Sequence, residues 1–352
     1  MKILIVNPGS TSTKIGIFNE KLVFEKVLRH DTEELKVFES VFDQYEFRLK
    51  LIQEALDEAG EELKSFAGIV GMGGLLKPIS GGVYLINEAI LSDLKNATYG
   101  EHASNLGAIL AYELARVAKV PSYIVDPVGV DEFCDIARIS GNKKVVRRSI
   151  FHALNQKAIA RMHAEKLGKK YNELSLVVAH LGGGISIGLH KNGEVIDAVN
   201  ALDGEGPFTP ERSGGLAALA VAQLCFFGDY TFNQIKKMLI GEGGFNSYFG
   251  TNNVQEIVQR AEGEAEVKTI LDAFIYQISK EIAALSTLEN GKIDGILLTG
   301  GIAYNSHIVA EITKRVGFIS NVFAYPGEDE LSALAKGALR ALKGEEEAKI
   351  YI

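Results

Sequence analysis

The chain has 352 residues, an apolar fraction of 47% and a formal net charge of −8. This length predicts two domains with substantial cores, and the acidic balance gives no electrostatic reason to expect a nucleic acid partner. No apolar run is long enough to span a bilayer, and Cys134 and Cys225 lie in no metal-ligand or redox spacing. We therefore expect a cytoplasmic protein with no membrane partner.

The N-terminal part of the sequence predicts a β-meander followed by alternating helices and strands. Strands are expected at residues 2–6, 13–18 and 22–28, with a polar turn rich in hydroxyls between the first two. A helix is expected over residues 33–60, where Gly60 would end it. The other expected elements of this part are an apolar helix at 103–118 and short strands at 66–70, 83–86 and 121–125.

A second meander is expected near the middle of the chain, after a helix at residues 149–167. Its strands lie at 176–179, 185–190 and 194–199, and the last two are joined by the hairpin turn Lys191-Asn192-Gly193. The order of strand, turn rich in Gly and Ser, strand, polar turn and strand therefore occurs twice. The two copies share little sequence, so the repeat is architectural.

The C-terminal part predicts mostly helices, with two further buried strands. The expected helices are at 216–226, 233–239, 254–259, 266–288, 305–316 and 330–342, and the strands are at 293–298 and 321–324. The tail at 345–352 is expected to be exposed or frayed. This alternation favours an α/β fold with layered sheets, and a polar, basic stretch at 141–149 is the expected domain boundary.

Three loops that follow buried strands are candidates for binding phosphate or nucleotide. In Asn7-Pro8-Gly9-Ser10-Thr11-Ser12-Thr13-Lys14, hydroxyl and backbone N–H groups gather in a tight turn that suits phosphate oxygens. It lacks the ending of a Walker loop. The second loop contains Gly182, Gly183 and Gly184, and the third Gly300 and Gly301. Each loop could also be an ordinary turn or a sharp bend.

In this order, the three loops resemble the phosphate-1, phosphate-2 and adenosine motifs of the acetate and sugar kinase, heat-shock chaperone and actin superfamily. The resemblance implies an actin-like ATPase fold: two duplicated ribonuclease H-like domains with mixed central sheets flanked by helices and an ATP cleft between them. We expect an acyl and phosphate domain at 1–145 plus 325–352, and a nucleotide-binding domain at 146–324.

The residues 7–14 are similar to the signature of acetate and butyrate kinases, the acetokinase family. Four further segments resemble butyrate kinases, at residues 73–79, 100–107, 149–156 and 206–214, and the last reads Gly206-Pro207-Phe208-Thr209-Pro210-Glu211-Arg212-Ser213-Gly214. The resemblance runs end to end, and the chain has the shorter length typical of butyrate kinases. It implies a phosphotransferase with a carboxyl group as acceptor, which converts ATP and butanoate to ADP and butanoyl phosphate.

A carboxylate acceptor is already ionised near neutral pH, so the reaction needs no general base. Catalysis then depends on positioning and on neutralising charge at the phosphoryl group, which calls for Arg, His and Mg²⁺. By the resemblance, Arg212 is the catalytic arginine, His152 binds the phosphoryl group in the transition state, and His180 lines the phosphate site. Each could instead be structural or a surface residue.

The resemblance also implies the remaining site residues. Asp126, a further catalytic residue, would help Asn7 and Glu330 hold Mg²⁺ or would orient the acceptor. Asp126 could also be a loop cap, and Glu330 a residue favoured at a helix N-terminus. The ATP phosphates would lie near Asn7, Ser10, Thr11, Ser12, Lys14, Gly182, Gly183, Gly184, Gly300 and Gly301. The acid would contact His102, Met72, Gly73 and Gly74. Met72 is a departure, because butyrate kinases usually have Arg there.

Several alternatives remain open at this point. A kinase for a branched acid such as 2-methylpropanoate would carry the same motifs, because one methyl group changes pocket binding by only about 1–3 kcal/mol. A non-enzymatic ATP-binding protein related to actin or chaperones would lack the matches at Arg212 and His152. Met72 could enlarge the acyl pocket, shift the acid preference or lower activity, as in an inactive paralogue, or it could be an incidental change at a structural site. By the resemblance, we also expect a homodimer or a higher homo-oligomer.

Overall fold

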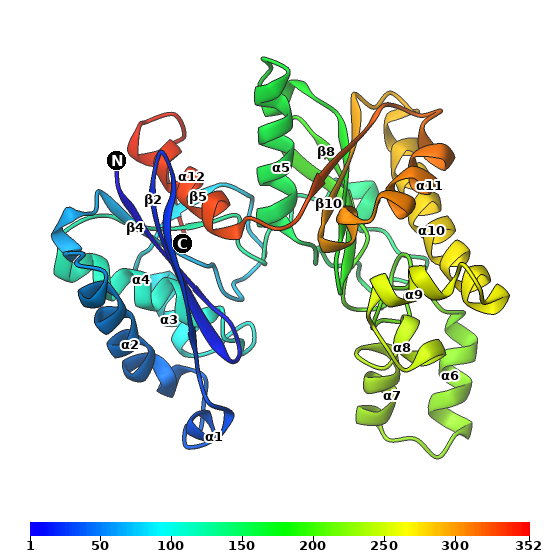
Figure 1. Ribbon diagram of the computed structural model, residues 1–352, viewed down its shortest axis with the longest axis horizontal. Coiled ribbons are helices and arrows are strands. Elements are labelled where there is room, and N and C mark those ends of the chain that lie inside the picture. The colour runs from blue at the N-terminus through cyan, green and yellow to red at the C-terminus, as the bar shows by residue number, and fades with distance from the viewer. The chain divides into compact units, whose positions relative to one another are not determined.

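The computed structural model describes all 352 residues, which form two compact units (Figure 1). Unit 1 comprises Met1–Asp131 and Asp329–Ile352, and unit 2 comprises Glu132–Glu328. Each contains one mixed sheet flanked by helices, which confirms the predicted α/β class. The functional roles predicted for residues 1–145 with 325–352 and for 146–324 stay predictions.

The sheet of unit 1 has seven strands in the order β12-β5-β6-β4-β1-β2-β3. β1 pairs antiparallel with β2 and β2 with β3, whereas β4 runs parallel to β1 and β6 runs parallel to β4. The meander predicted at the N-terminus is therefore confirmed. The strands are β1 Ile3–Pro8, β2 Ser12–Asn19, β3 Lys21–Arg29, β4 Gly68–Gly71, β5 Val83–Leu85, β6 Ser122–Val125 and β12 Lys349–Ile350.

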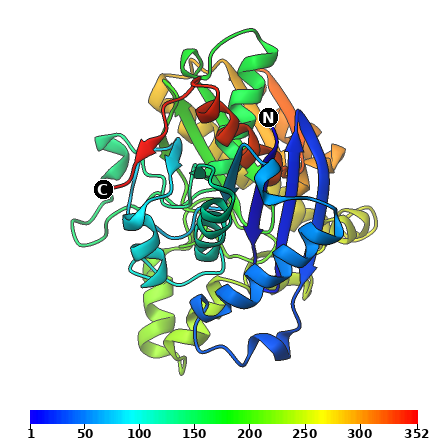
Figure 2. The same cartoon turned by 90° about the vertical axis from the view of Figure 1, so that its left-hand side faces the viewer.

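Helices cover both faces of this sheet (Figure 2). Alternate residues of a strand point to opposite faces, and β4 shows which helix lies on which face. A side chain at Gly71 would collide with Gly107 of α4 (Asn105–Ala118), whereas one at Gly68 would meet Leu342 of α12 (Glu330–Leu342). α12 thus returns the C-terminal part of the chain to the face opposite α4.

The sheet of unit 2 has the order β11-β10-β7-β8-β9. β7, β8 and β9 form an antiparallel meander, and β10 and β11 extend it in parallel from β7. This pattern matches β6-β4-β1-β2-β3 of unit 1 strand for strand, so the predicted architectural repeat is confirmed. The strands are β7 Leu176–Leu181, β8 Ile185–Lys191, β9 Glu194–Ala198, β10 Gly295–Gly300 and β11 Val322–Pro326.

The central strand β7 of unit 2 is buried on both faces. Leu176 and Val178 pack toward α5 (Ala153–Lys166), while Val177 and Ala179 pack in the larger core that includes α10 (Ala265–Ser286). Such a continuous apolar strand is typical of a sheet covered on both sides. The other helices of unit 2 are α6 Ala218–Phe227, α7 Phe232–Leu239, α8 Gly244–Phe249, α9 Val254–Arg260 and α11 Ser306–Val316.

The prediction of a single helix over residues 33–60 is wrong. The structure has α1 at Thr32–Leu35, a 3₁₀ turn at Phe42–Gln44 and α2 at Tyr45–Glu58. The break has a local cause, because the Ser40 backbone N–H and hydroxyl both donate to Asp43 and the Asp43 N–H donates back to the Ser40 hydroxyl. This reciprocal bonding starts a new helical segment, as a capping box does.

Two further differences concern helices: one begins later than expected, and one was not expected at all. The helix expected from residue 149 begins at Ala153. Helix α3, Glu88–Lys95, was not predicted; its N-cap is Asn87, whose side chain accepts a hydrogen bond from the Ile90 N–H.

The C-terminal tail is largely exposed, as expected, but the alternative that it is frayed is wrong. β12 pairs in parallel with β5, and Tyr351 is only 3% exposed. The Tyr351 hydroxyl donates to Asp93 at 2.6 Å, and its carbonyl accepts from the Asn87 side chain. One buried aromatic residue with two polar anchors therefore ties down a segment in which half of the residues are charged.

We expect Tyr351→Ala to lower the free energy of unfolding by about 3–5 kcal/mol, because it leaves a cavity and strips Asp93 of its donor. Urea unfolding of the purified variant measures this. Ile352→Ala is the matched control, since that side chain is 92% exposed and its change should stay within about 0.5 kcal/mol. Equal losses in the two variants would contradict the buried anchor.

No helix in the structure is both long and apolar enough to cross a membrane.

Candidate functional site

Two histidines of unit 2 stack against each other beside the glycine loop. His180 lies in β7, and His152 is the residue before α5. Their ring centroids are 3.7 Å apart with an interplanar angle of 12°. His180 Nδ1 lies 2.9 Å from Asn155 Oδ1 and its Nε2 lies 3.0 Å from Glu328 Oε1, so oxygen acceptors face both ring nitrogens. The structure thus brings these two predicted site residues together.

The environment of His152 keeps its imidazole neutral. Burial, followed by the nearby His180 and Arg212, lowers the pKa of His152 from 6.5 to about 3, against an opposing effect of Glu328. Its Nδ1 lies 2.7 Å from the Ser186 hydroxyl of β8. Near neutral pH this ring can therefore donate one hydrogen bond to a ligand without carrying charge.

Arg212 is held in a tight turn against the same glycine loop. The Arg212 N–H donates to the Thr209 hydroxyl, which itself donates to the Gly183 carbonyl at 2.7 Å. The guanidinium donates to the Ala201 carbonyl, while its buried Nε has no partner. A side chain at Gly184 would meet Arg212 Nη1 at 2.3 Å, so only glycine permits this approach. A buried, unpartnered donor of this kind is suited to an anionic ligand.

A pocket of about 600 Å³ opens beside the glycine loops of unit 2. Gly182, Gly183 and Gly301 line it, as three of the predicted nucleotide residues. Sequence reasoning missed the rest of its wall, which includes Asn252, Asn253, Gln255, Tyr304 and Asn305. Asn253 and Asn305 are helix N-caps, and this local role leaves no separate mark of a binding residue in the sequence.

The other two glycines of these loops serve close packing. Gly184 admits the Arg212 guanidinium, and Gly300 has φ +85° with the Leu181 carbonyl 2.4 Å from where a Cβ would stand. Gly300 also exchanges backbone hydrogen bonds with Gly327. Neither glycine lines the pocket, so their contribution to a nucleotide site is through the shape of the loops.

In unit 1, the hydroxyl-rich loop is built around a buried cation that sequence reasoning missed. The Arg48 guanidinium of α2 donates to the carbonyls of Gly9, Ser10 and Ser12 and to the Thr13 hydroxyl. Arg48 is 0% exposed, and burial lowers its pKa to about 10. With these carbonyls turned toward Arg48, the backbone can present its N–H groups elsewhere, while Ser10 and Thr11 are exposed.

The position of Arg48 offered a sequence signal. The buried residues of α2 are Arg48, Ile52, Ala55 and Leu56. This is the spacing of an apolar helix stripe, so a charged residue falls where a core residue is expected. An arginine there needs buried acceptors, and here the loop carbonyls supply them.

Asn7 and Glu330 of unit 1 also meet, with Asn7 Nδ2 donating to Glu330 Oε2 at 2.7 Å. Lys14 is the ladder partner of Asn7, so both side chains point to the same face of the sheet. The Lys14 ammonium forms a half-exposed ion pair with Glu25 at 3.8 Å. No three His, Cys, Asp or Glu side chains converge as a ready metal site.

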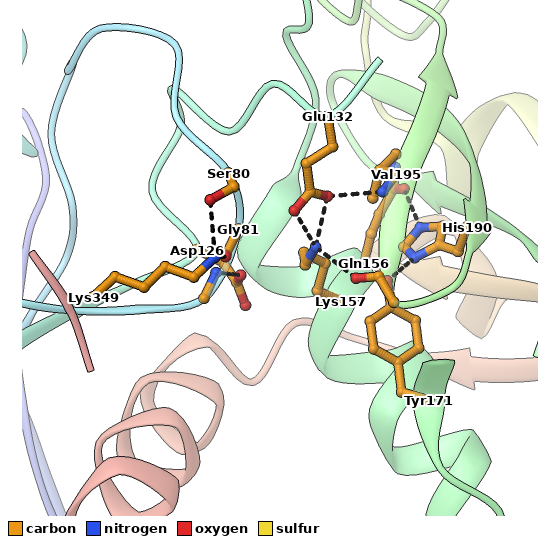
Figure 3. Close-up of polar contacts among 12 residues, drawn as sticks. Ser80, Gly81, Asp126, Glu132, Gln156, Lys157, Tyr171, His190, Val195 and Lys349 are labelled. Carbon is orange, nitrogen blue, oxygen red and sulfur yellow. Dashed lines mark hydrogen bonds and ion pairs between the residues drawn. The ribbon is translucent and has the colours of Figure 1, made fainter. Parts of the chain in front are cut away.

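Asp126 occupies a strained position at the end of β6. Its φ is +38° although Pro127 follows, a combination that is costly for a residue other than glycine. The Asp126 carboxylate accepts from the Gly82 N–H at 2.7 Å, and its own N–H donates to the Gly82 carbonyl. Lys349 of the tail donates to Ser80 and Gly81 and so supports the same turn (Figure 3). Such imposed strain is common at functional sites.

The residues predicted to contact the acid lie close to these elements of unit 1. The Met72 N–H bonds the carbonyl of Val6, and a side chain at Gly73 would collide with Pro127. One at Gly74 would collide with Asn105. His102 is exposed, and its Nδ1 bonds the Ser104 hydroxyl at 2.8 Å. The two glycines are thus required by close packing, and His102 has a local structural partner.

We expect the protein to lose stability as the pH falls from about 6.5 toward 4. Burial lowers the pKa of His30 to about 4 and that of His152 to about 3, from 6.5. In this range the unfolded chain binds protons that the folded chain does not, so acid favours unfolding. Urea unfolding at about pH 7.5 and about pH 5 measures the slope. His30→Asn, which can still bond Thr13, should flatten it; an unchanged slope would contradict this origin.

Residues 135–321 match the sequence profile of the acetokinase family. The chain is 53% identical over 352 residues to "Butyrate kinase 1" of Clostridium acetobutylicum, with 99% of each chain covered. It is 49% identical to "Probable butyrate kinase" of Clostridium botulinum, again covering 99% of each.

Among solved structures, the acetate kinase of Porphyromonas gingivalis aligns with a TM-score of 0.80, covering 97% of this chain and 99% of that chain at 16% identity. At this identity the match shows the fold alone, and it is the actin-like ATPase fold that the sequence resemblance implied.

Proposed function

The chain belongs to the acetokinase family, and we propose that it is a butyrate kinase that converts ATP and butanoate to ADP and butanoyl phosphate. The observation that carries this proposal is the 53% identity, over 99% of both chains, with the protein named "Butyrate kinase 1". The histidines and the arginine gathered beside the glycine loop in unit 2 provide the chemistry that such a transfer needs.

The reaction is a direct in-line transfer. A butanoate carboxylate oxygen attacks the γ-phosphorus of ATP, a new P–O bond forms, and the bond from that phosphorus to the bridging oxygen breaks as ADP leaves with the electron pair. The carboxylate is already ionised, so no residue removes a proton. Arg212, His152 and His180 stabilise the negative charge on the phosphoryl oxygens in the transition state.

The nucleotide binds in the pocket of unit 2, with its phosphates at Gly182 and Gly183, in the loop whose shape depends on Gly184. Within unit 1, the donors proposed for phosphate are those of Ser10, Thr11, Ser12 and Lys14, although the Lys14 charge is partly offset by Glu25. Asn7, Glu330 and Asp126 would supply oxygen donors for Mg²⁺, which prefers few carboxylates together with water and phosphate. When bound, Mg²⁺ neutralises phosphate charge.

A panel of straight and branched acids, from acetate to five-carbon acids, tests the function by ADP release with ATP and Mg²⁺. We expect the highest kcat/KM with butanoate. A clear preference for 2-methylpropanoate would support the branched-acid alternative instead. If no acid stimulates ADP release while ATP still binds, the kinase proposal fails, and an actin-like or chaperone-like ATP-binding protein becomes the better interpretation.

Met72 takes the place of an arginine that butyrate kinases usually have, and an apolar thioether cannot replace a fixed charge. It contributes to the wall of the acid site together with Gly73, Gly74 and His102. Met72→Arg, measured on the same panel, distinguishes a change of acid preference from inactivity. An active wild-type protein eliminates the inactive-paralogue alternative.

The exposed apolar surface of α6 supports self-association as a homodimer or higher oligomer. The cytoplasmic location stays a prediction from the sequence. No residue of α6 is buried, and Phe226 and Phe227 are 82% and 88% exposed. Exposed apolar patches of this kind mark interaction surfaces.

We expect Phe226→Glu with Phe227→Glu to shift the protein toward monomer in sedimentation velocity. Phe318→Glu is the control, since Phe318 is 82% exposed after α11; equal assembly of both variants would contradict this surface.

A further inference from the structure

A line of hydrogen bonds runs through the interior of unit 2 to His152. It begins at Tyr171, whose hydroxyl lies 2.7 Å from His190 Nδ1. His190 Nε2 lies 3.0 Å from Gln156 Oε1 (Figure 3). Gln156 and His190 are both 0% exposed. None of these residues carries a role in the proposed transfer, yet buried polar networks are costly unless every member is satisfied.

The orientation of the Gln156 amide follows from its neighbours. Its Nε2 lies 3.1 Å from the Ser186 carbonyl, which can only accept a hydrogen bond. The nitrogen must therefore face Ser186 and the oxygen must face His190 Nε2, which donates to it. The next residue, Lys157, is also buried, and it donates to Glu132 and to the Gly193 carbonyl. That pair anchors α5 and with it the position of Gln156.

The hydrogen of the Ser186 hydroxyl then has one place to go. Ser186 Oγ accepts from Gln156 Nε2 at 2.8 Å and from the backbone N–H of His152 at 3.2 Å. A hydroxyl has two acceptor positions and one donor. Both acceptor positions are used, so the hydroxyl donates to His152 Nδ1, which lies 2.7 Å away.

We propose that Gln156 and Ser186 are positioning residues that hold His152 as the neutral tautomer with its hydrogen on Nε2. His152 Nδ1 is occupied as an acceptor, and the Nε2–H is left as the donor that faces a ligand. Protonating Nδ1 would require Ser186 to accept three donors while its own hydrogen lost its acceptor. The arrangement therefore resists both the other tautomer and the imidazolium. The depressed pKa of His152 agrees with this.

This inference rests on the proposed function only for its catalytic consequence. In phosphoryl transfer, a donor in a fixed direction stabilises the transition state without reorganisation. A His152 ring free to exchange tautomers would present an acceptor lone pair to the phosphoryl oxygen for part of the time. The tautomer itself is a property of the protein alone.

Proton-coupled ¹⁵N NMR of protein labelled at histidine reads the tautomer directly. The chain has 7 histidines, and the spectrum of a His152→Asn variant identifies the resonances of His152. We expect wild-type His152 to carry its hydrogen on Nε2 from about pH 6 to about pH 8. Gln156→Glu replaces the donor to Ser186 by an acceptor of the same shape, so the Ser186 hydroxyl should turn to Glu and His152 should gain a hydrogen on Nδ1. Wild-type His152 protonated at Nδ1 would overturn the proposal.

Kinetics separates positioning from a merely structural role. Ser186→Ala should lower kcat roughly 10–100-fold, the range found when groups that orient metal-ligating histidines are removed, with a smaller change in KM for ATP. Ser279→Ala is the matched control, because it removes another buried hydroxyl, on α10. Unchanged His152 resonances in both Gln156→Glu and Ser186→Ala would refute the positioning roles. If the tautomer shifts as expected but no acid is phosphorylated by the wild type, only the proposed function fails.

Discussion

Replacing Arg212 with alanine is expected to lower kcat for acyl phosphate formation by about 10³-fold or more, the loss found when an arginine that stabilises a transferring phosphoryl group is removed. Arg212 lies in a turn fastened to the glycine loop through Thr209, and its buried Nε has no protein partner. A guanidinium placed in this way has donors available for the oxygens that gain charge in the transition state.

Steady-state kinetics with ATP, Mg²⁺ and butanoate measures this loss, and thermal unfolding checks that the variant is folded. Arg212→Lys should recover little, because an ammonium lacks the planar fork of donors. Gly184→Ala should also lower kcat, since the added methyl occupies the space of the guanidinium. Arg315→Ala, at an exposed position of α11, is the control. An Arg212→Ala variant that retains the wild-type kcat would show that Arg212 has no role in catalysis.

Replacing Arg48 with leucine is expected to lower the free energy of unfolding by about 3 kcal/mol or more, because three loop carbonyls and the buried Thr13 hydroxyl lose their donor together. The same change should raise KM for ATP, since the loop at residues 9–13 loses the cation that holds its carbonyls inward. Arg48→Lys keeps a charge but cannot reach all these acceptors at once, so we expect an intermediate effect on both quantities.

Urea unfolding and ATP titration of the kinetics measure the two effects of Arg48. Lys50→Ala is a matched control in the same helix, because Lys50 is 76% exposed and its ion pair with Glu54 spans 3.7 Å. Exposed pairs of this kind contribute about 0–1 kcal/mol. A stable Arg48→Leu variant with unchanged KM would show that the loop holds its shape without the buried guanidinium.

The duplicated architecture was predictable because it depends on local patterns. Strands such as β1 and β7 are continuous runs of apolar, β-branched residues, and their turns carry the glycines and hydroxyls that end them. Hydrophobic periodicity and the residues that form turns act over a few positions, so both can be recognised in a single sequence. Helix boundaries depended on finer detail, and the Ser40–Asp43 reciprocal bonds broke a helix whose apolar spacing ran on across them.

By itself, the sequence determined the α/β class, the repeat, and the histidines, arginine and glycines that lie together in unit 2. Only the tertiary structure decided that Arg48 organises the opening loop, that Asn252 and Tyr304 line the pocket, and that Tyr351 pins the tail. The physical reason is the distance along the chain over which each interaction acts. Motifs act through neighbours along the chain, whereas a buried guanidinium or a hydrogen bond such as that of Ser186 to His152 acquires its role from partners more than thirty residues away.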